Sequence, residues 1–132
     1  MRIPILKLGS ILLTSIQSDI TDEQAMTLQA DILAKLDQTQ SAGVVLDISA
    51  LDVVDSYMAR ILSETARMAR LMGGEVVITG MNPMVAVTLV EMGRELVGVM
   101  TALTLEQGVD RLKQRLTVNA GEDPEVPGDD GR

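Results

Sequence analysis

The fold is decided by one stretch of the chain, residues 44–62, which read VVLDISALDVVDSYMARIL. Residues 44–48 form a nearly continuous apolar run, which is typical of a strand covered on both faces. After an acidic turn, Asp55 stands where a helix N-cap is expected, because its carboxylate can accept a hydrogen bond from an amide inside the helix. Apolar residues then recur at helical spacing from Met58. The stretch therefore predicts a buried strand, a turn and an amphipathic helix.

The helix predicted after Asp55 has two faces and ends at Gly73-Gly74, a pair typical of a helix C-terminus. We expect its core stripe to contain Met58, Ile61, Leu62, Thr65, Met68, Ala69 and Met72. We expect the opposite face to contain Ser56, Arg60, Ser63, Glu64, Arg67 and Arg70.

Outside this stretch, short apolar runs alternate with helical patterns. Residues 3–8 and 11–16 are apolar and are joined by a Gly-Ser turn, so we expect a hairpin. A capping box at Thr21 and an N-cap at Asn82 mark the starts of two further helices. The remaining strands are expected near residues 75–79 and 99–103, and the last helix near residues 104–116. The order after the hairpin is βαβαβα, which predicts an α/β sandwich with a mixed, largely parallel sheet covered by about four helices.

Composition narrows the classes of function. The chain has 132 residues, of which 46% are apolar, enough for the core of one domain. It contains no Cys and no His, so disulfides, thiolate metal sites and the usual general base are absent. A net charge of −8 and a single aromatic residue argue against a nucleic-acid partner. No apolar run is long enough for a membrane span, so we expect a cytoplasmic protein.

The C-terminal segment differs from the rest of the chain. We expect a single domain over residues 1–116 and a disordered acidic tail over residues 117–132. This tail has five acidic residues and one arginine, and therefore contributes −4 of the net charge.

Ser56 is the candidate functional residue. It lies at the first turn of a predicted helix, where free amides and the positive end of the helix dipole favour added negative charge. Asp47, Asp52 and Asp55 oppose that charge. A hydroxyl between attraction and repulsion suits a phosphorylation switch, although an ordinary helix start would also explain a serine here.

An enzymatic function has little support in the sequence. Three aspartates could suggest a Mg²⁺ site. However, a strand end, a turn and a cap explain Asp47, Asp52 and Asp55 without a metal. No Gly-rich phosphate loop is present. We therefore expect no catalytic residue, metal or cofactor, and a small-molecule binder or hydrolase that uses this acidic cluster is the remaining alternative.

A partner surface is expected around the same helix start. Tyr57, the only aromatic residue, lies beside Ser56 and is a candidate interface anchor. The other candidate contact residues are Arg60, Ser63, Arg67, Met81 and Met84.

The motif from residue 44 to Asp55-Ser56 resembles the signature of STAS domains, the bacterial anti-sigma-factor antagonists. Segments 3–8, 77–89 and 101–108 resemble, more narrowly, the branch of this family that forms the scaffold of the stressosome. The resemblance extends over residues 3–116. Most antagonists continue the Asp-Ser pair with Ser-Gly, whereas this chain has Tyr57-Met58, which favours the scaffold branch. The acidic tail is not part of the family pattern.

The resemblance implies a scaffold for stress signalling that associates with itself and with STAS-containing sensor paralogues in a large hollow assembly. It also implies that a serine/threonine kinase, held by the assembly until stress, phosphorylates Ser56. The alternative within the family is a direct antagonist that binds an anti-sigma factor while unphosphorylated.

Overall fold

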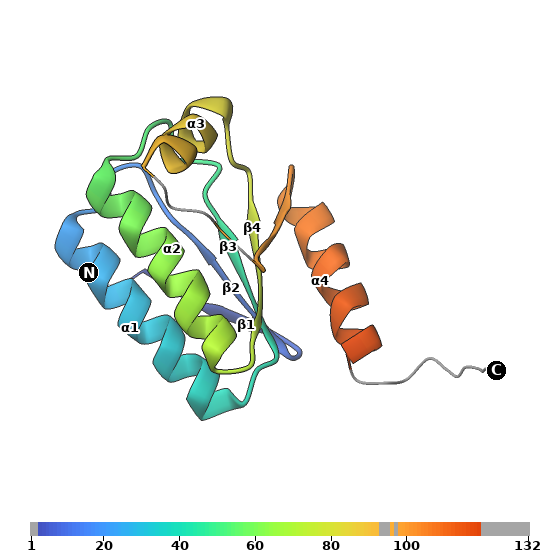
Figure 1. The fold of residues 1–132 in the computed structure, drawn as a ribbon. Coiled ribbons are helices and arrows are strands. Elements are labelled where there is room, and N and C mark those ends of the chain that lie inside the picture. The colour runs from blue at the N-terminus through green and yellow to red at the C-terminus, as the bar shows by residue number, and fades with distance from the viewer. Residues whose placement is uncertain (1–2, 93–95, 97, 120–132) are drawn as a thin grey trace.

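The computed structural model of the chain describes residues 3–92, 96 and 98–119. In this part of the chain, strands and helices follow the predicted order (Figure 1). The strands are β1 (Leu6–Leu8), β2 (Ile11–Ser15), β3 (Gly43–Asp47), β4 (Glu75–Thr79) and β5 (Met100–Ala102). The helices are α1 (Asp22–Thr39), α2 (Ser56–Leu71), α3 (Pro83–Glu91) and α4 (Leu105–Asn119).

The strands form one sheet in the order β1-β2-β3-β4-β5. β1 and β2 are an antiparallel hairpin, and β2 to β5 are parallel to one another. Helices α1 and α2 cover one face of the sheet, and α4 covers the other (Figure 1). The prediction of an α/β sandwich with a mixed, largely parallel sheet is confirmed.

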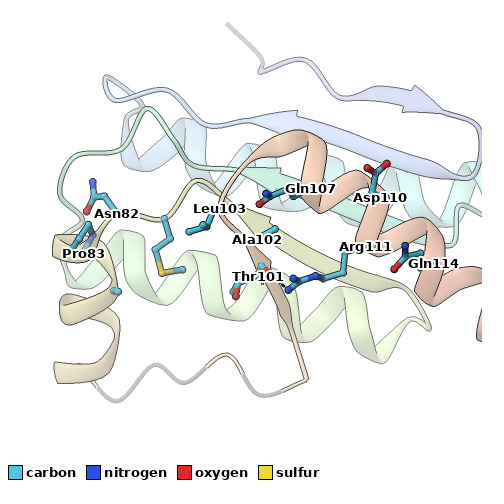
Figure 2. A pocket seen from close by; sticks show the side chains of 11 residues that line it. Asn82, Pro83, Thr101, Ala102, Leu103, Gln107, Asp110, Arg111 and Gln114 are labelled. Atoms are coloured by element: carbon cyan, nitrogen blue, oxygen red, sulfur yellow. Dashed lines mark hydrogen bonds between the residues drawn. The ribbon is translucent and has the colours of Figure 1, made fainter.

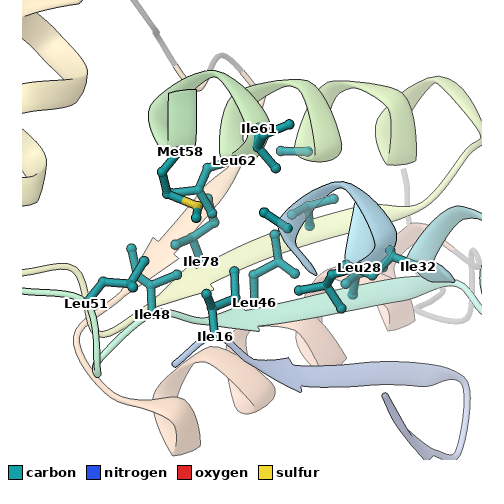
Figure 3. Packing of buried hydrophobic residues seen from close by; sticks show 14 of the residues in the cluster. Ile16, Leu28, Ile32, Leu46, Ile48, Leu51, Met58, Ile61, Leu62 and Ile78 are labelled. Carbon is teal, nitrogen blue, oxygen red and sulfur yellow. The ribbon is translucent and has the colours of Figure 1, made fainter. Parts of the chain in front are cut away.

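The core has two parts because both faces of the sheet are covered. Successive residues of a strand point to opposite faces. Accordingly, Leu46 and Ile78 pack under α1 and α2 (Figure 3), whereas Val45 and Val77 pack under Leu112 of α4. This arrangement explains why the central strands are apolar without alternation.

Two residues of the predicted helix, one in α2 and one just after it, lie differently from the prediction. Met72 was expected in the core stripe but follows the last residue of α2 and is exposed. Ser63 was expected on the outer face but is only 2% exposed, and its hydroxyl donates to the Arg60 carbonyl at 3.1 Å. The buried arc of α2 is wider than its apolar stripe, because the small side chains of Ala59, Ser63 and Ala66 are covered as well.

Helix α4 extends past the predicted domain boundary. The tail was expected from residue 117, but the helix continues to Asn119, and the Thr117 hydroxyl donates to the Lys113 carbonyl one turn earlier at 3.0 Å. The rest of the acidic segment, residues 120–132, lies outside the described residues. Among the described helices, none has the length and apolarity that a membrane crossing requires.

Candidate phosphorylation switch

Ser56 is the first residue of α2, and its side chain is exposed. Asp55 has extended backbone angles and caps the helix, since its Oδ1 accepts a hydrogen bond from the Met58 amide at 2.8 Å. The predicted N-cap is therefore confirmed. In the part of the chain that the structure describes, the Ser56 hydroxyl and the amides of Ser56 and Tyr57 make no hydrogen bond. An accessible hydroxyl thus lies beside two free donors at the positive end of a helix dipole.

Asp47 connects three strands at the edge of the sheet nearest to this helix start. Its carboxylate accepts hydrogen bonds from Thr79 at 2.8 Å, from Ser49 at 2.8 Å and from Ser15 at 3.4 Å. Asp47 is therefore a structural acceptor that ties β2 and β4 to the end of β3. Within the described residues, the aspartates of this region form no group that could hold a metal ion.

Asn82 braces the loop that leads to Ser56. Its Oδ1 caps α3 by accepting from the Val85 amide at 2.9 Å. Its Nδ2 donates to the carbonyls of Leu51 at 3.0 Å and Asp52 at 3.2 Å. The sequence predicted the cap, but the brace joins residues about thirty positions apart, for which the local pattern carries no signal. The side chain of Asn82 therefore links the start of α3 to the approach to α2.

Gly80 allows the segment that follows β4 to approach the backbone of the loop that follows β3. Its φ is +79°, in the left-handed region that favours glycine. A Cβ at this position would lie 2.6 Å from the Ser49 Cβ and 2.9 Å from the Ser49 Cα. Only glycine therefore fits between β4 and the loop that follows β3.

We expect Gly80→Ala to lower the free energy of unfolding by at least about 2 kcal/mol, because it combines backbone strain with a clash. Gly9→Ala is the matched control, since Gly9 also has a positive φ of +61° but has no atom within 4 Å of a built Cβ. Urea unfolding of both variants measures the difference. Equal losses of stability would contradict the close approach at Ser49.

The residues predicted to contact a partner differ in their exposure and in the element that carries them. Tyr57 is half-buried, and the Arg60 guanidinium lies over its ring at 5.2 Å from the centroid. Arg67 is exposed two turns further along α2. Met81 and Met84 flank Asn82, the former half-buried and the latter exposed. Ser63 is covered and is not part of this surface.

A groove of about 930 Å³ begins at Asn82 and was not predicted from the sequence. It runs from Asn82 and Pro83 at one end to Arg111 and Gln114 at the other (Figure 2). Arg111 lies at the wall of the groove, where its guanidinium donates a hydrogen bond of 2.7 Å to the Thr101 carbonyl. Because α3, β5 and α4 each supply one wall, no single sequence pattern marks the groove. Asn82 lines the groove and also braces the loop before Ser56, so one side chain is common to both features.

This mixed sheet with its four helices is the architecture of a known family. The model of the STAS domain matches residues 2–114, and the chain belongs to this family. A serine-to-glutamate variant of RsbS from Moorella thermoacetica is 39% identical, with a TM-score of 0.80 over 86% of this chain and 97% of that one. A chain in the structure of the stressosome, a signal integration and transduction hub, is 41% identical, with a TM-score of 0.77 over 86% of this chain and 98% of that one.

A longer relative matches over only part of its length. The RsbT co-antagonist protein RsbRA of Bacillus subtilis is 29% identical over 106 residues, which are 78% of this chain and 39% of RsbRA. This chain therefore spans about two fifths of the length of RsbRA. Together with the two solved structures, this match confirms the resemblance to STAS domains and, more narrowly, to RsbS and the stressosome.

Proposed function

We propose that this chain is a non-enzymatic scaffold of a cytoplasmic stressosome that holds a serine kinase and releases it when Ser56 is phosphorylated. The observation that carries the proposal is the exposed Ser56 hydroxyl beside two free amides at the start of α2. The similarity to RsbS and to a stressosome chain supports the scaffold role. The similarity to RsbRA, an RsbT co-antagonist, supports an RsbR-like sensor paralogue and an RsbT-like kinase as partners.

The fold can accept a phosphoryl group at Ser56 without rearrangement. The helix is already capped by Asp55, so the two free amides remain available to a phosphate. The helix dipole adds about 0.3–1 kcal/mol of stabilisation. Phosphorylation is therefore expected to change the charge of this surface and to leave the fold unchanged.

The same phosphoryl group is unfavourable at an interface. It adds about −1.5 to −2 charge at pH 7 next to the carboxylates of Asp52 and Asp55. Arg60, one turn along α2, is the nearest cation in the sequence, and it lies over the Tyr57 ring. We infer that the kinase contacts Tyr57, Arg60 and Met81 around the hydroxyl, with Arg67 further along the same helix. Kinase binding at this surface would remove water from the phosphate on Ser56, whose charge Arg60 does not fully neutralise, and this desolvation is unfavourable.

A direct anti-sigma-factor antagonist is the alternative function of the same switch. The two functions differ in the assembly they require. We expect the chain, mixed with a STAS-containing sensor paralogue, to form a particle far larger than a dimer that takes up the kinase. Native mass measurement tests this expectation. A monomer or dimer that binds an anti-sigma factor and no kinase would contradict the scaffold role and support the antagonist.

A further inference from the structure

Helix α3 is apolar on both of its faces. Val85 and Leu89 are buried against the core. On the opposite face Met84, Val87 and Val90 are 60%, 50% and 77% exposed. We call these three residues the outer stripe of α3. The outer face of α2, in contrast, carries Arg60 and Arg67. A helix that is apolar all round is normally buried, so the outer stripe is expected to be covered when the protein functions.

We propose that a second copy of this chain covers the outer stripe, through an antiparallel contact between the two α3 helices. This inference rests on the proposed function, since it names one self-contact of the assembly. The stripe has a spacing of i, i+3 and i+6, so its three side chains lie on one face of the helix. About a two-fold axis at Val87, Val87 meets its own counterpart, and Met84 meets Val90 of the other copy. A stripe without charge is complementary to itself in such an isologous contact.

Charge at the helix ends selects the antiparallel orientation. Glu91 is the last residue of α3, where its carboxylate faces the negative end of its own helix dipole. Within the described residues, Glu91 makes no ion pair that would offset this position. In an antiparallel pair it lies beside the positive end of the other α3. A parallel pair would place the two glutamates together, so the contact favours one arrangement.

The size of the stripe determines how the contact has to be measured. Stable interfaces bury about 800 Å² per partner, which three side chains on a nine-residue helix do not reach. The α3 contact is therefore weak in isolation and gains strength only inside a larger assembly. Covalent trapping detects such a contact, whereas the mass of the isolated protein does not.

The chain has no cysteine, so single-cysteine variants of the full-length protein give an unambiguous trap. A disulfide needs Cα atoms within about 7 Å of each other, which Val87→Cys satisfies only if the two helices meet at that residue. We expect Val87→Cys to form a disulfide-linked dimer at least tenfold faster than Leu71→Cys under the same mild oxidation. Leu71 is the matched control, because it is apolar, 87% exposed and on α2.

The register has its own test. Val90→Cys is expected to cross-link faster with Met84→Cys in a mixture than with itself. Equal rates for Val87→Cys and Leu71→Cys, or faster self-linking of Val90→Cys than of Val87→Cys, would overturn the antiparallel contact.

Kinase binding separates this inference from the proposed function. Val87→Asp introduces a charge on an exposed face, so we expect the variant to fold, to lose the α3 contact and to retain the kinase. Trapping without any kinase binding by the unmodified protein would leave the self-contact standing and contradict the scaffold function. Kinase binding by the unmodified protein, without preferential trapping at Val87, would support the scaffold function and contradict the self-contact.

Discussion

Phosphorylation of Ser56 is expected to weaken the affinity of the kinase for this chain by at least tenfold, or about 1.4 kcal/mol. The helix dipole stabilises the phosphate by about 0.3–1 kcal/mol in the free protein. At the interface the phosphate is desolvated beside Asp52 and Asp55, and close like charges cost several kcal/mol. Calorimetric titration of unmodified and phosphorylated protein with the kinase measures the difference. Equal or tighter binding after phosphorylation would rule out the release mechanism.

Substitutions at Ser56 extend this prediction. Ser56→Ala should retain the kinase permanently and block the response. Ser56→Asp should mimic release only in part, because a carboxylate carries one charge where a phosphate carries about −1.5 to −2. Ser10→Asp is the matched control. Ser10 is exposed in the turn between β1 and β2, beside the residue that precedes β3, so it lies at the end of the sheet opposite to the switch. The Ser10→Asp variant gains the same charge as Ser56→Asp and should leave the affinity for the kinase unchanged.

Leu62→Asp is expected to unfold the domain or to lower its stability by about 4 kcal/mol, the scale of burying an unpaired charge in a packed core. Leu62 is 2% exposed and lies in the cluster between α2 and the sheet (Figure 3). Urea unfolding monitored by circular dichroism measures the loss.

Arg67→Ala is the control for Leu62→Asp, because Arg67 is exposed and has no ion pair among the described residues. Its stability should change by no more than about 0.5 kcal/mol. Arg70 is also exposed, but its guanidinium is paired with the Glu75 carboxylate at 2.7 Å, so Arg70→Ala is unsuitable as a control. Equal destabilisation by Leu62→Asp and Arg67→Ala would show that the faces of α2 are wrongly assigned.

Sequence reasoning succeeded where the deciding interaction is local. The caps at Thr21, Asp55 and Asn82 each involve an amide three residues away, and all three are present. The element order follows from hydrophobic periods of two and 3.6 residues, which are properties of short windows. These signals were sufficient for the fold and for the position of Ser56.

The sequence could not predict contacts that depend on which segments meet in space. In the sequence Asp47 is one of several neighbouring carboxylates. In the structure it accepts hydrogen bonds from hydroxyl groups of β2 and β4. Ser63 reads as polar and therefore outward, yet it is covered by its neighbours in the fold. The groove at Asn82 likewise has walls from three separate segments. Each of these features follows from the tertiary arrangement.

The brace at Asn82 has a consequence for the speed of signalling. Because the loop before Ser56 is tied to α3 through two carbonyls, the start of α2 is held in place before any modification. Under the proposed function, we therefore expect no slow exchange between two conformers to separate phosphorylation from its effect on binding. The response time is set by the transfer and removal of the phosphoryl group and by the dissociation rate of the partner. Under the proposed function, a population of molecules with this brace would report its fractional phosphorylation in a graded way, without a threshold from the fold itself.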